Sequence, residues 1–336
     1  MIGAVSASTV QPSGRLVDEI LEAAREGKPR ENGLTIASDS LDSIDPGLLE
    51  QSAEYIDFVK IGLSLPLMVE RSWLHERIQH YHDLGVKVMS GGTLIEVAVQ
   101  KGIVSKVLDG LGELEFDVVG VSEGAGALPS KAKQMIASKV SELSKEWIYE
   151  LGMKDTSSKL VADTVSKIQE ALELKSHRVI VDVPNTGMRP RGDDDQREGA
   201  WGVLNELAGT FGPPNLIFET QEMQQLSALV LEFGPTVNLA GVPVNQALVL
   251  EMQRLGLTVD TLGLSRHLQN FEGPPAAKFV YHLIRTEHPI DQTTLCLRSG
   301  MPRRTVQASL STLIEAGLVR EVSDSSDLRR HRYTMR

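Results

Sequence analysis

Polar residues that could do chemistry follow the short apolar runs of this chain. The carboxylates are Asp39, Glu96, Glu123, Glu150, Asp182 and Glu219, the lysines are Lys60 and Lys154, and the amide is Asn238. Carboxylates gathered around one opening are hard oxygen ligands, the kind that Mg2+ prefers. These residue types indicate a site that could bind a metal ion, provided that the fold brings them together.

The elements that must position these residues alternate along the chain. Eight short apolar runs read as strands, at 34–37, 56–61, 86–89, 118–121, 147–151, 179–183, 216–218 and 237–240. Amphipathic segments read as helices, at 45–54, 70–84, 93–112, 130–145, 158–175, 195–210, 221–233 and 244–256. Eight strand–helix units predict a closed (β/α)8 TIM barrel, in which chemistry occurs at the carboxyl ends of the strands. An open doubly wound parallel sheet is the alternative.

Length and composition fit a barrel with a small additional domain. The chain has 336 residues, 41% of them hydrophobic and 24% charged, and Cys296 is its single cysteine. No apolar run approaches the roughly 18 residues that a membrane helix needs, and residues 1–14 lack the features of a signal peptide. We therefore expect a cytoplasmic protein. The predicted divisions are a leading helix and arm at 1–30, the barrel at 31–265, a linker at 266–275 and a small domain at 276–336.

The last 61 residues differ from the rest in charge. Residues 276–336 hold 10 Lys or Arg and 6 Asp or Glu, a net charge of +4, whereas residues 1–275 hold 24 and 39, a net charge of −15. The order of predicted elements here is helix, short helix, glycine turn, longer helix and hairpin. This order, with the stretches 294–306 and 310–319, resembles the winged helix-turn-helix of MarR-like regulators.

A winged helix would place a set of basic and polar residues toward duplex DNA. Arg303, Arg304 and Gln307 would lie on the recognition helix, whose first turns reach base edges in the major groove. Arg329, Arg330 and Arg332 would lie in the wing, where contacts to phosphates are expected. The alternative is a winged helix used for dimerisation or docking, with arginines that only face solvent.

Four stretches of the predicted barrel carry a second resemblance. They are Tyr55–Gly62, Gly85–Glu96, Glu219 with Gln224, Gln225 and Glu232–Ala240, and Arg254–Leu257 with Asp260–Gly263. Together they resemble the phosphosulfolactate synthase family over about residues 31–265. The resemblance implies a Mg2+-dependent carbon–sulfur lyase that adds sulfite to phosphoenolpyruvate, a step towards coenzyme M that is typical of archaea. We also expect a homo-oligomer.

The resemblance also implies roles for individual residues. Lys154 matches the position of the family's proposed catalytic lysine, with Glu150 and Lys60 as further catalytic candidates. Glu96, Glu123 and Glu219 are candidates for binding the metal. The substrate-binding candidates are Asp39, Gly91, Gly92, Thr93, Asn238, Arg189 and Arg191. Two simpler interpretations remain open: Lys60 could form an ion pair with a neighbouring carboxylate, and residues 91–93 could be a turn and helix cap.

The chain departs from the family where positive charge is expected. The family has a lysine where this chain has Ser40, an arginine near the end of strand 6 and a basic residue near Met223. A charge-assisted hydrogen bond is worth about 1.5–3 kcal/mol, so losing three would weaken anion binding unless Arg189 and Arg191 replace them. The alternatives are therefore a metabolite-sensing transcriptional regulator with an altered barrel, or an enzyme that represses its own operon.

Overall fold

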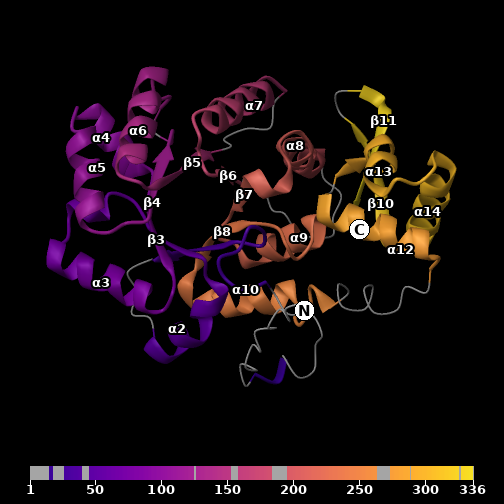
Figure 1. Ribbon diagram of the computed structural model, residues 1–336, viewed down its shortest axis with the longest axis horizontal. Helices are drawn as coiled ribbons and strands as arrows, with labels where there is room; N and C mark the ends of the chain where they lie inside the picture. Colours follow the sequence, from indigo (N-terminus) through magenta and orange to yellow (C-terminus); the bar gives the residue numbers. More distant parts are fainter. Residues whose placement is uncertain are drawn as a thin grey trace, which may run out of the picture.

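The fold is a closed parallel barrel, seen in a computed structural model (Figure 1). The structure describes residues 15–17, 26–39, 45–124, 126–152, 158–183, 195–262, 273–287, 289–324 and 327–335. Within these ranges the strands β1 to β8 are Thr35–Asp39, Phe58–Ile61, Lys87–Ser90, Val118–Ser122, Glu146–Gly152, Val179–Asp182, Leu216–Glu219 and Leu239–Pro243. Each strand pairs in parallel with the next, and β8 pairs with β1. The prediction of a closed barrel is confirmed, and the alternative of an open doubly wound sheet is excluded.

The barrel helices also follow the prediction, with one difference. They are α2 Pro46–Ser52, α3 Arg71–Asp83, α4 Thr93–Gln100, α5 Val104–Glu113, α6 Ser130–Glu142, α7 Ser158–Glu173, α8 Asp195–Phe211, α9 Met223–Phe233 and α10 Ala247–Arg254. The segment predicted as one helix over 93–112 forms two. Gly102 adopts a φ of 67° between them, a left-handed conformation that glycine tolerates and that interrupts a helix.

Apolar side chains fill the centre of the barrel and fix which residues line its mouth. The central cluster is Leu34, Ile36, Phe58, Met89, Val118, Ile148, Ile180, Ile217 and Ala240. Successive side chains of a strand point to opposite faces, so the residue two positions later points inward as well. On β2, β5, β6 and β7 these residues are Lys60, Glu150, Asp182 and Glu219. The alternation therefore brings four ionisable side chains to the carboxyl end of the barrel.

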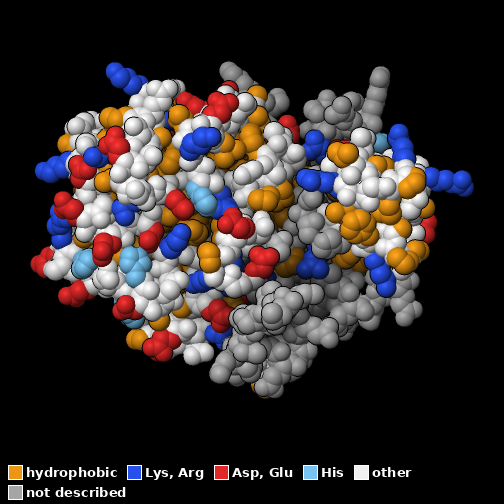
Figure 2. Space-filling model, viewed as in Figure 1, with side chains coloured by type: hydrophobic (Ala, Val, Ile, Leu, Met, Phe, Trp, Pro, Cys, Tyr) orange, Lys and Arg blue, Asp and Glu red, His pale blue; other side chains and the backbone are white. Residues whose placement is uncertain are grey.

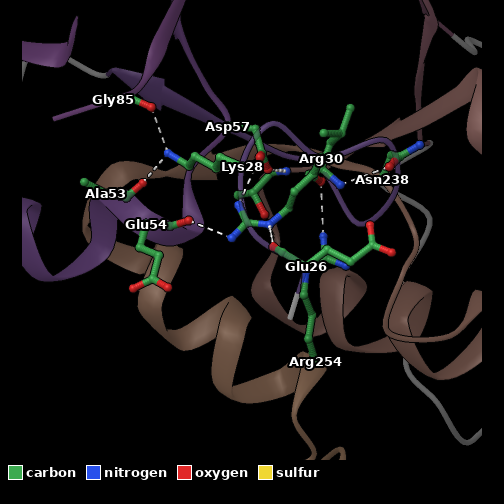
Figure 3. A network of polar contacts seen from close by, with 11 residues as sticks. Glu26, Lys28, Arg30, Ala53, Glu54, Asp57, Gly85, Asn238 and Arg254 are labelled. Atoms are coloured by element: carbon green, nitrogen blue, oxygen red, sulfur yellow. Dashed lines mark hydrogen bonds and ion pairs between the residues drawn. The ribbon is translucent and has the colours of Figure 1, made fainter. Parts of the chain in front are cut away.

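A polar network closes the opposite, amino-terminal end of the barrel (Figure 3). Arg30 lies in the segment before β1 and its Nη1 pairs with Asp57 Oδ1 at 3.0 Å. The same guanidinium donates to the carbonyl oxygens of Glu26, at 2.6 Å, and Glu54, at 2.9 Å. Asp57 Oδ2 accepts the backbone N–H of Thr35 at 2.8 Å. The network ties the chain that enters the barrel to the starts of β1 and β2.

Asn238 belongs to this closed end, which corrects its prediction as a substrate-binding residue of the mouth. Its Oδ1 accepts the N–H of Leu34 at 2.9 Å, and its Nδ2 donates to the carbonyl of Leu216 at 3.0 Å. Arg254 Nη1 donates to the neighbouring carbonyl of Val237 at 2.7 Å. The apolar run at 237–240 is the beginning of strand 8 and not its end, because β8 starts at Leu239 and continues to Pro243.

The C-terminal residues form a second, smaller core beside the barrel. Its elements are α12 Pro275–Glu287, β9 Ile290–Asp291, α13 Gln292–Ser299, α14 Arg303–Glu315, β10 Val319–Asp324 and β11 Asp327–Met335. The three strands form one antiparallel sheet in the order β10-β11-β9. Gly300 ends α13 in a left-handed conformation with a φ of 65°. We refer to residues 273–335 as the C-terminal unit.

The C-terminal unit rests on α8 and α9 of the barrel (Figure 1). Glu232 of α9 forms an ion pair with Arg320 of β10, and its Oε1 accepts a hydrogen bond from Asn205 Nδ2 of α8 at 3.0 Å. A Cβ on Gly209 of α8 would overlap the guanidinium of Arg332. Arg320 and Arg332 therefore face the barrel, whereas the sequence predicts that Arg332 contacts DNA phosphates from the wing.

Several predicted features lie outside the described residues. They are most of the leading helix, Ser40, Lys154, Arg189, Arg191 and most of the linker at 266–275. The backbone of Arg329 and Arg330 belongs to β11, but their side chains are outside the description. Among the described helices, none combines the length and hydropathy needed to cross a membrane.

Candidate active site

Lys60 is the centre of an ionisable cluster at the mouth of the barrel. Its Nζ lies 2.5 Å from Glu219 Oε1 and 3.5 Å from Glu150 Oε2. The lysine side chain is 10% exposed and those of Glu150 and Glu219 are 14% and 19% exposed, so the cluster is largely shielded from water. The ion-pair interpretation of Lys60 is therefore confirmed as geometry. We call Lys60, Glu150, Asp182 and Glu219 the mouth cluster.

Burial and crowding shift the pKa values within the mouth cluster. Burial raises the pKa of Glu150 to about 7, attraction to Lys60 opposes the rise, and repulsion from Glu219 adds to it. Partial desolvation at the rim, with repulsion from Glu219, raises the pKa of Asp182 to about 6. Burial would lower the pKa of Lys60, but the two glutamates outweigh it and raise that pKa. One permanently charged lysine thus lies beside a carboxyl group that exchanges its proton near neutral pH.

Glycines let the backbone approach the mouth cluster closely. A Cβ on Gly120 would lie 2.6 Å from Glu150 Oε1, and one on Gly92 would lie 2.5 Å from Ser122 N. Gly91 is held against Ile61, whose carbonyl accepts the Gly91 N–H at 2.9 Å. Gly92 is the N-cap of α4 and Thr93 is the first, exposed residue of that helix. The predicted alternative of a turn and helix cap for residues 91–93 is confirmed, and their contact with substrate stays a prediction.

Glu96, a predicted metal ligand, lies in α4 and is 4% exposed. Its Oε1 accepts the hydroxyl of Ser122 and the backbone N–H of Gly124, the latter at 3.0 Å. These contacts join α4 to the end of β4 and do not extend to Lys60. Glu96 is therefore adjacent to the mouth cluster and no part of it.

Glu123 and Asp39 point away from the mouth, into the layer between strands and helices. Glu123 forms ion pairs with Lys133 of α6 at 2.8 Å and Lys167 of α7 at 2.7 Å. Asp39 is bound by Arg77 of α3 through both carboxylate oxygens, at 2.5 and 2.7 Å. The prediction of one rim that collects all the strand-end carboxylates is corrected. Each of these two residues is one position out of phase with the inward-facing side chains of its strand.

The described residues contain no ready-made site for the expected Mg2+. Within this part of the chain, no three His, Cys, Asp or Glu side chains are grouped closely enough to hold a metal ion. Glu96, Glu123 and Glu219 have separate partners, as given above, and Lys60 lies between the carboxylates of Glu150 and Glu219. Binding of Mg2+ at the mouth stays a prediction.

Most of the chain matches one known protein family. Residues 23–260 match the model of a family described as (2R)-phospho-3-sulfolactate synthase (ComA), which is more than half of the chain. The chain belongs to this family. Residues 273–335 lie beyond the matched range, so the C-terminal unit is an addition to the (2R)-phospho-3-sulfolactate synthase barrel.

Curated relatives of the family support the same assignment. The chain is 29% identical over 240 residues to the phosphosulfolactate synthase of Methanocaldococcus jannaschii, covering 69% of this chain and 95% of that protein. It is 28% identical over 250 residues to that of Bacillus subtilis, covering 71% and 96%. It is 26% identical over 252 residues to that of Methanothermobacter thermautotrophicus, covering 73% and 97%. One of these relatives is bacterial, so the expectation of an archaeal-type protein stays a prediction.

Proposed function

We propose that the barrel is a phosphosulfolactate synthase, a lyase that joins sulfite to phosphoenolpyruvate. The observation that carries the proposal is the mouth cluster, at the carboxyl end of a barrel of this family. In the reaction, the sulfur lone pair attacks the methylene carbon and forms the C–S bond. The π electrons of the double bond move to the adjacent carbon and its carboxylate, and that carbon then takes a proton.

The mouth cluster offers groups for two of these tasks. Lys60 is a fixed positive charge that would hold the substrate carboxylate and stabilise the negative charge that develops on it. Glu150, whose burial raises its pKa to about 7, would supply the proton to the carbon. Glu219 would orient Lys60 through the 2.5 Å ion pair. Lys154 stays a predicted second acid, and Asp39 would act only through the helix that it anchors.

The charge of the cluster limits how substrate can bind. One lysine faces three carboxyl groups, and both substrates are anions. The raised pKa values of Glu150 and Asp182 reduce the negative charge near neutral pH. Further positive charge would come from Arg189 and Arg191, or from Mg2+. Both sources stay predictions; for Mg2+ the test is calorimetric binding with and without a chelator.

Purified protein incubated with sulfite and phosphoenolpyruvate tests the proposal, with and without Mg2+. Consumption of phosphoenolpyruvate and appearance of a sulfonate by NMR are expected, and a Lys60→Met variant should lose at least about 100-fold in kcat/KM. Asp109→Asn, which changes an exposed surface pair with Lys139, is the matched control. Absence of any sulfonate from native protein under all these conditions would reject the synthase and favour the metabolite-sensing regulator.

We also propose that the C-terminal unit is a winged helix-turn-helix that binds duplex DNA. The supporting observation is α14, which follows the left-handed turn at Gly300 and carries exposed Arg303, Arg304 and Gln307 on its first turns. Figure 2 shows Lys and Arg side chains along the outer edge of this unit. The docking of Arg320 and Arg332 on the barrel supports the competing role of a packing module.

Fluorescence anisotropy with labelled random duplex DNA distinguishes these roles. A DNA-binding unit should lose affinity steeply as salt rises, and the double variant Arg303→Ala, Arg304→Ala should bind more weakly than the native protein. Lys278→Ala, an exposed lysine of α12, is the control. Equal binding by the native protein and the double variant would leave the packing role. Light scattering of the same sample tests the predicted homo-oligomer.

A further inference from the structure

Glu96 fastens the first turn of α4 to the end of β4. One of its carboxylate oxygens accepts two hydrogen bonds, from the hydroxyl of Ser122 and from the N–H of Gly124 at 3.0 Å. Glu96 lies on the first turn of its helix and is 4% exposed, so water does not compete for these contacts. A buried charge-assisted pair of hydrogen bonds is among the stronger polar contacts in a protein. Glu96 thus binds the end of β4 to the first turn of α4.

The same joint brings the N-cap of α4 next to Glu150. Gly92 packs so tightly on Ser122 that a Cβ would lie 2.5 Å from its nitrogen and 2.6 Å from its Cβ. A Cβ on Gly120 of β4 would lie 3.0 Å from Gly92 N and 2.6 Å from Glu150 Oε1. The Gly92 amide and the Glu150 carboxyl group therefore flank the same point on β4. This amide is one of the groups that favour the charged form of Glu150 and lower its pKa against the effect of burial.

We propose that Glu96 is a positioning residue for the proton donor of the mouth cluster. It holds α4 on β4, and α4 in turn presents the Gly92 amide to the carboxyl group of Glu150. Glu96 itself contacts neither substrate nor the reacting atoms. The proposal rests on the proposed function for its kinetic consequences, and it replaces the predicted role of Glu96 as a metal ligand.

Three variants separate positioning from metal binding. Glu96→Gln keeps the oxygen that accepts from Ser122 and Gly124, and should retain kcat within about threefold of native. Glu96→Ala removes that oxygen and should lower kcat about 10- to 100-fold with a smaller change in KM, because the donor group is displaced and not deleted. Ser122→Ala removes one of the two hydrogen bonds and should give a smaller loss in the same direction. If Glu96→Gln is as inactive as Glu96→Ala, the negative charge itself is needed and the proposal is wrong.

A second measurement reports on the position of the Gly92 amide and does not depend on enzymatic activity. The chain contains a single Gly–Gly pair, Gly91–Gly92. Protein labelled only with glycine carrying carbonyl 13C and 15N therefore gives one amide–carbonyl correlation, which belongs to Gly92. This resonance should overlay the native position in Glu96→Gln and move by more than its linewidth in Glu96→Ala.

The two measurements fail in different ways. A Gly92 resonance that moves in Glu96→Ala, in a protein without synthase activity, would overturn the proposed function and leave the positioning role intact. A resonance that stays in place in Glu96→Ala would overturn the positioning role, whatever the activity. Thermal unfolding of each variant shows that the folded state is retained, and Glu54→Gln, on the surface near the closed end, is the control for both measurements.

Discussion

The two ends of the barrel both carry buried ionisable groups, yet they use them differently. At the closed end, Arg30 is shared among Asp57 and two backbone carbonyls, and Asp57 accepts a further backbone N–H. At the mouth, one lysine serves two glutamates at unequal distances, and burial raises the pKa of the more distant one to about 7. Matched partners at the closed end stabilise the fold, whereas incomplete matching at the mouth leaves a proton that can move. The same residue types thus serve stability or chemistry according to how fully they are paired.

The largest expected effect is on catalysis at the mouth. Glu150→Gln removes the proposed proton donor and should lower kcat by roughly 10²- to 10⁴-fold, the range for loss of a general acid. Unfolding by urea should change little, since the amide fills the same space. Stopped assays of sulfonate formation give the rate. Native activity in this variant would remove Glu150 from the mechanism and weaken the contrast between the two ends.

The closed end should show the opposite pattern. Asp57→Ala leaves Arg30 buried without its ion-pair partner, and breaking a buried pair costs about 3–5 kcal/mol of unfolding free energy. Activity per folded molecule should stay native. Glu113→Ala, in the exposed pair with Arg71, is the control and should cost less than about 1 kcal/mol. A large loss of kcat in folded Asp57→Ala would show that this end also takes part in chemistry.

Substitutions of two glycines in α8 change the free energy of unfolding without changing any charge at either end of the barrel. Gly202→Ala meets open space and should stabilise the protein by up to about 1 kcal/mol, the difference in helix propensity between the two residues. Gly209→Ala gains the same propensity, but its methyl group would displace the guanidinium of Arg332, so it should stabilise less than Gly202→Ala. Urea unfolding of both variants measures the difference. An equal gain in the two variants would mean that Arg332 does not pack on α8.

The smallest expected effect is the dependence of kcat on pH, which tests whether Glu150 is the group that gives up the proton. Glu150 acts as a donor when protonated, and its protonated fraction falls as pH rises through about 7. We therefore expect kcat to decrease above that pH, approaching tenfold per pH unit, and to level off on the acid side. The residual activity of Glu150→Gln should lack this alkaline limb. A limb that persists in the variant would belong to another group.

Much of the fold follows from the sequence, because alternating apolar runs and amphipathic segments allow few architectures. The mouth was predicted less well. Glu150, Asp182 and Glu219 are in phase with Ile148, Ile180 and Ile217, which face the barrel centre, and so they converge. Counting in steps of two along each strand would have separated them from the outward-facing carboxylates.

Other parts of the site depend on information that the strand pattern lacks. Lys133 and Lys167, which neutralise Glu123, come from two different helices, and no local signal links them to β4. Arg77 and Tyr81, which bind Asp39, do stand four residues apart on α3, a spacing that places both on one helix face. The prediction for Asn238 was wrong because an apolar run indicates a strand but does not show where that strand begins and ends.

Glu232 joins the added C-terminal unit to the barrel through contacts that do not involve the mouth cluster. Its carboxylate binds both Asn205 and Arg320, and its carbonyl accepts the hydroxyl of Thr334 at 3.5 Å. In a barrel without residues 273–335, the carboxylate of Glu232 would lose its ion-pair partner Arg320. Glu232→Gln would remove that unpaired charge, so this substitution should accompany the truncation when the barrel alone is compared with its shorter relatives.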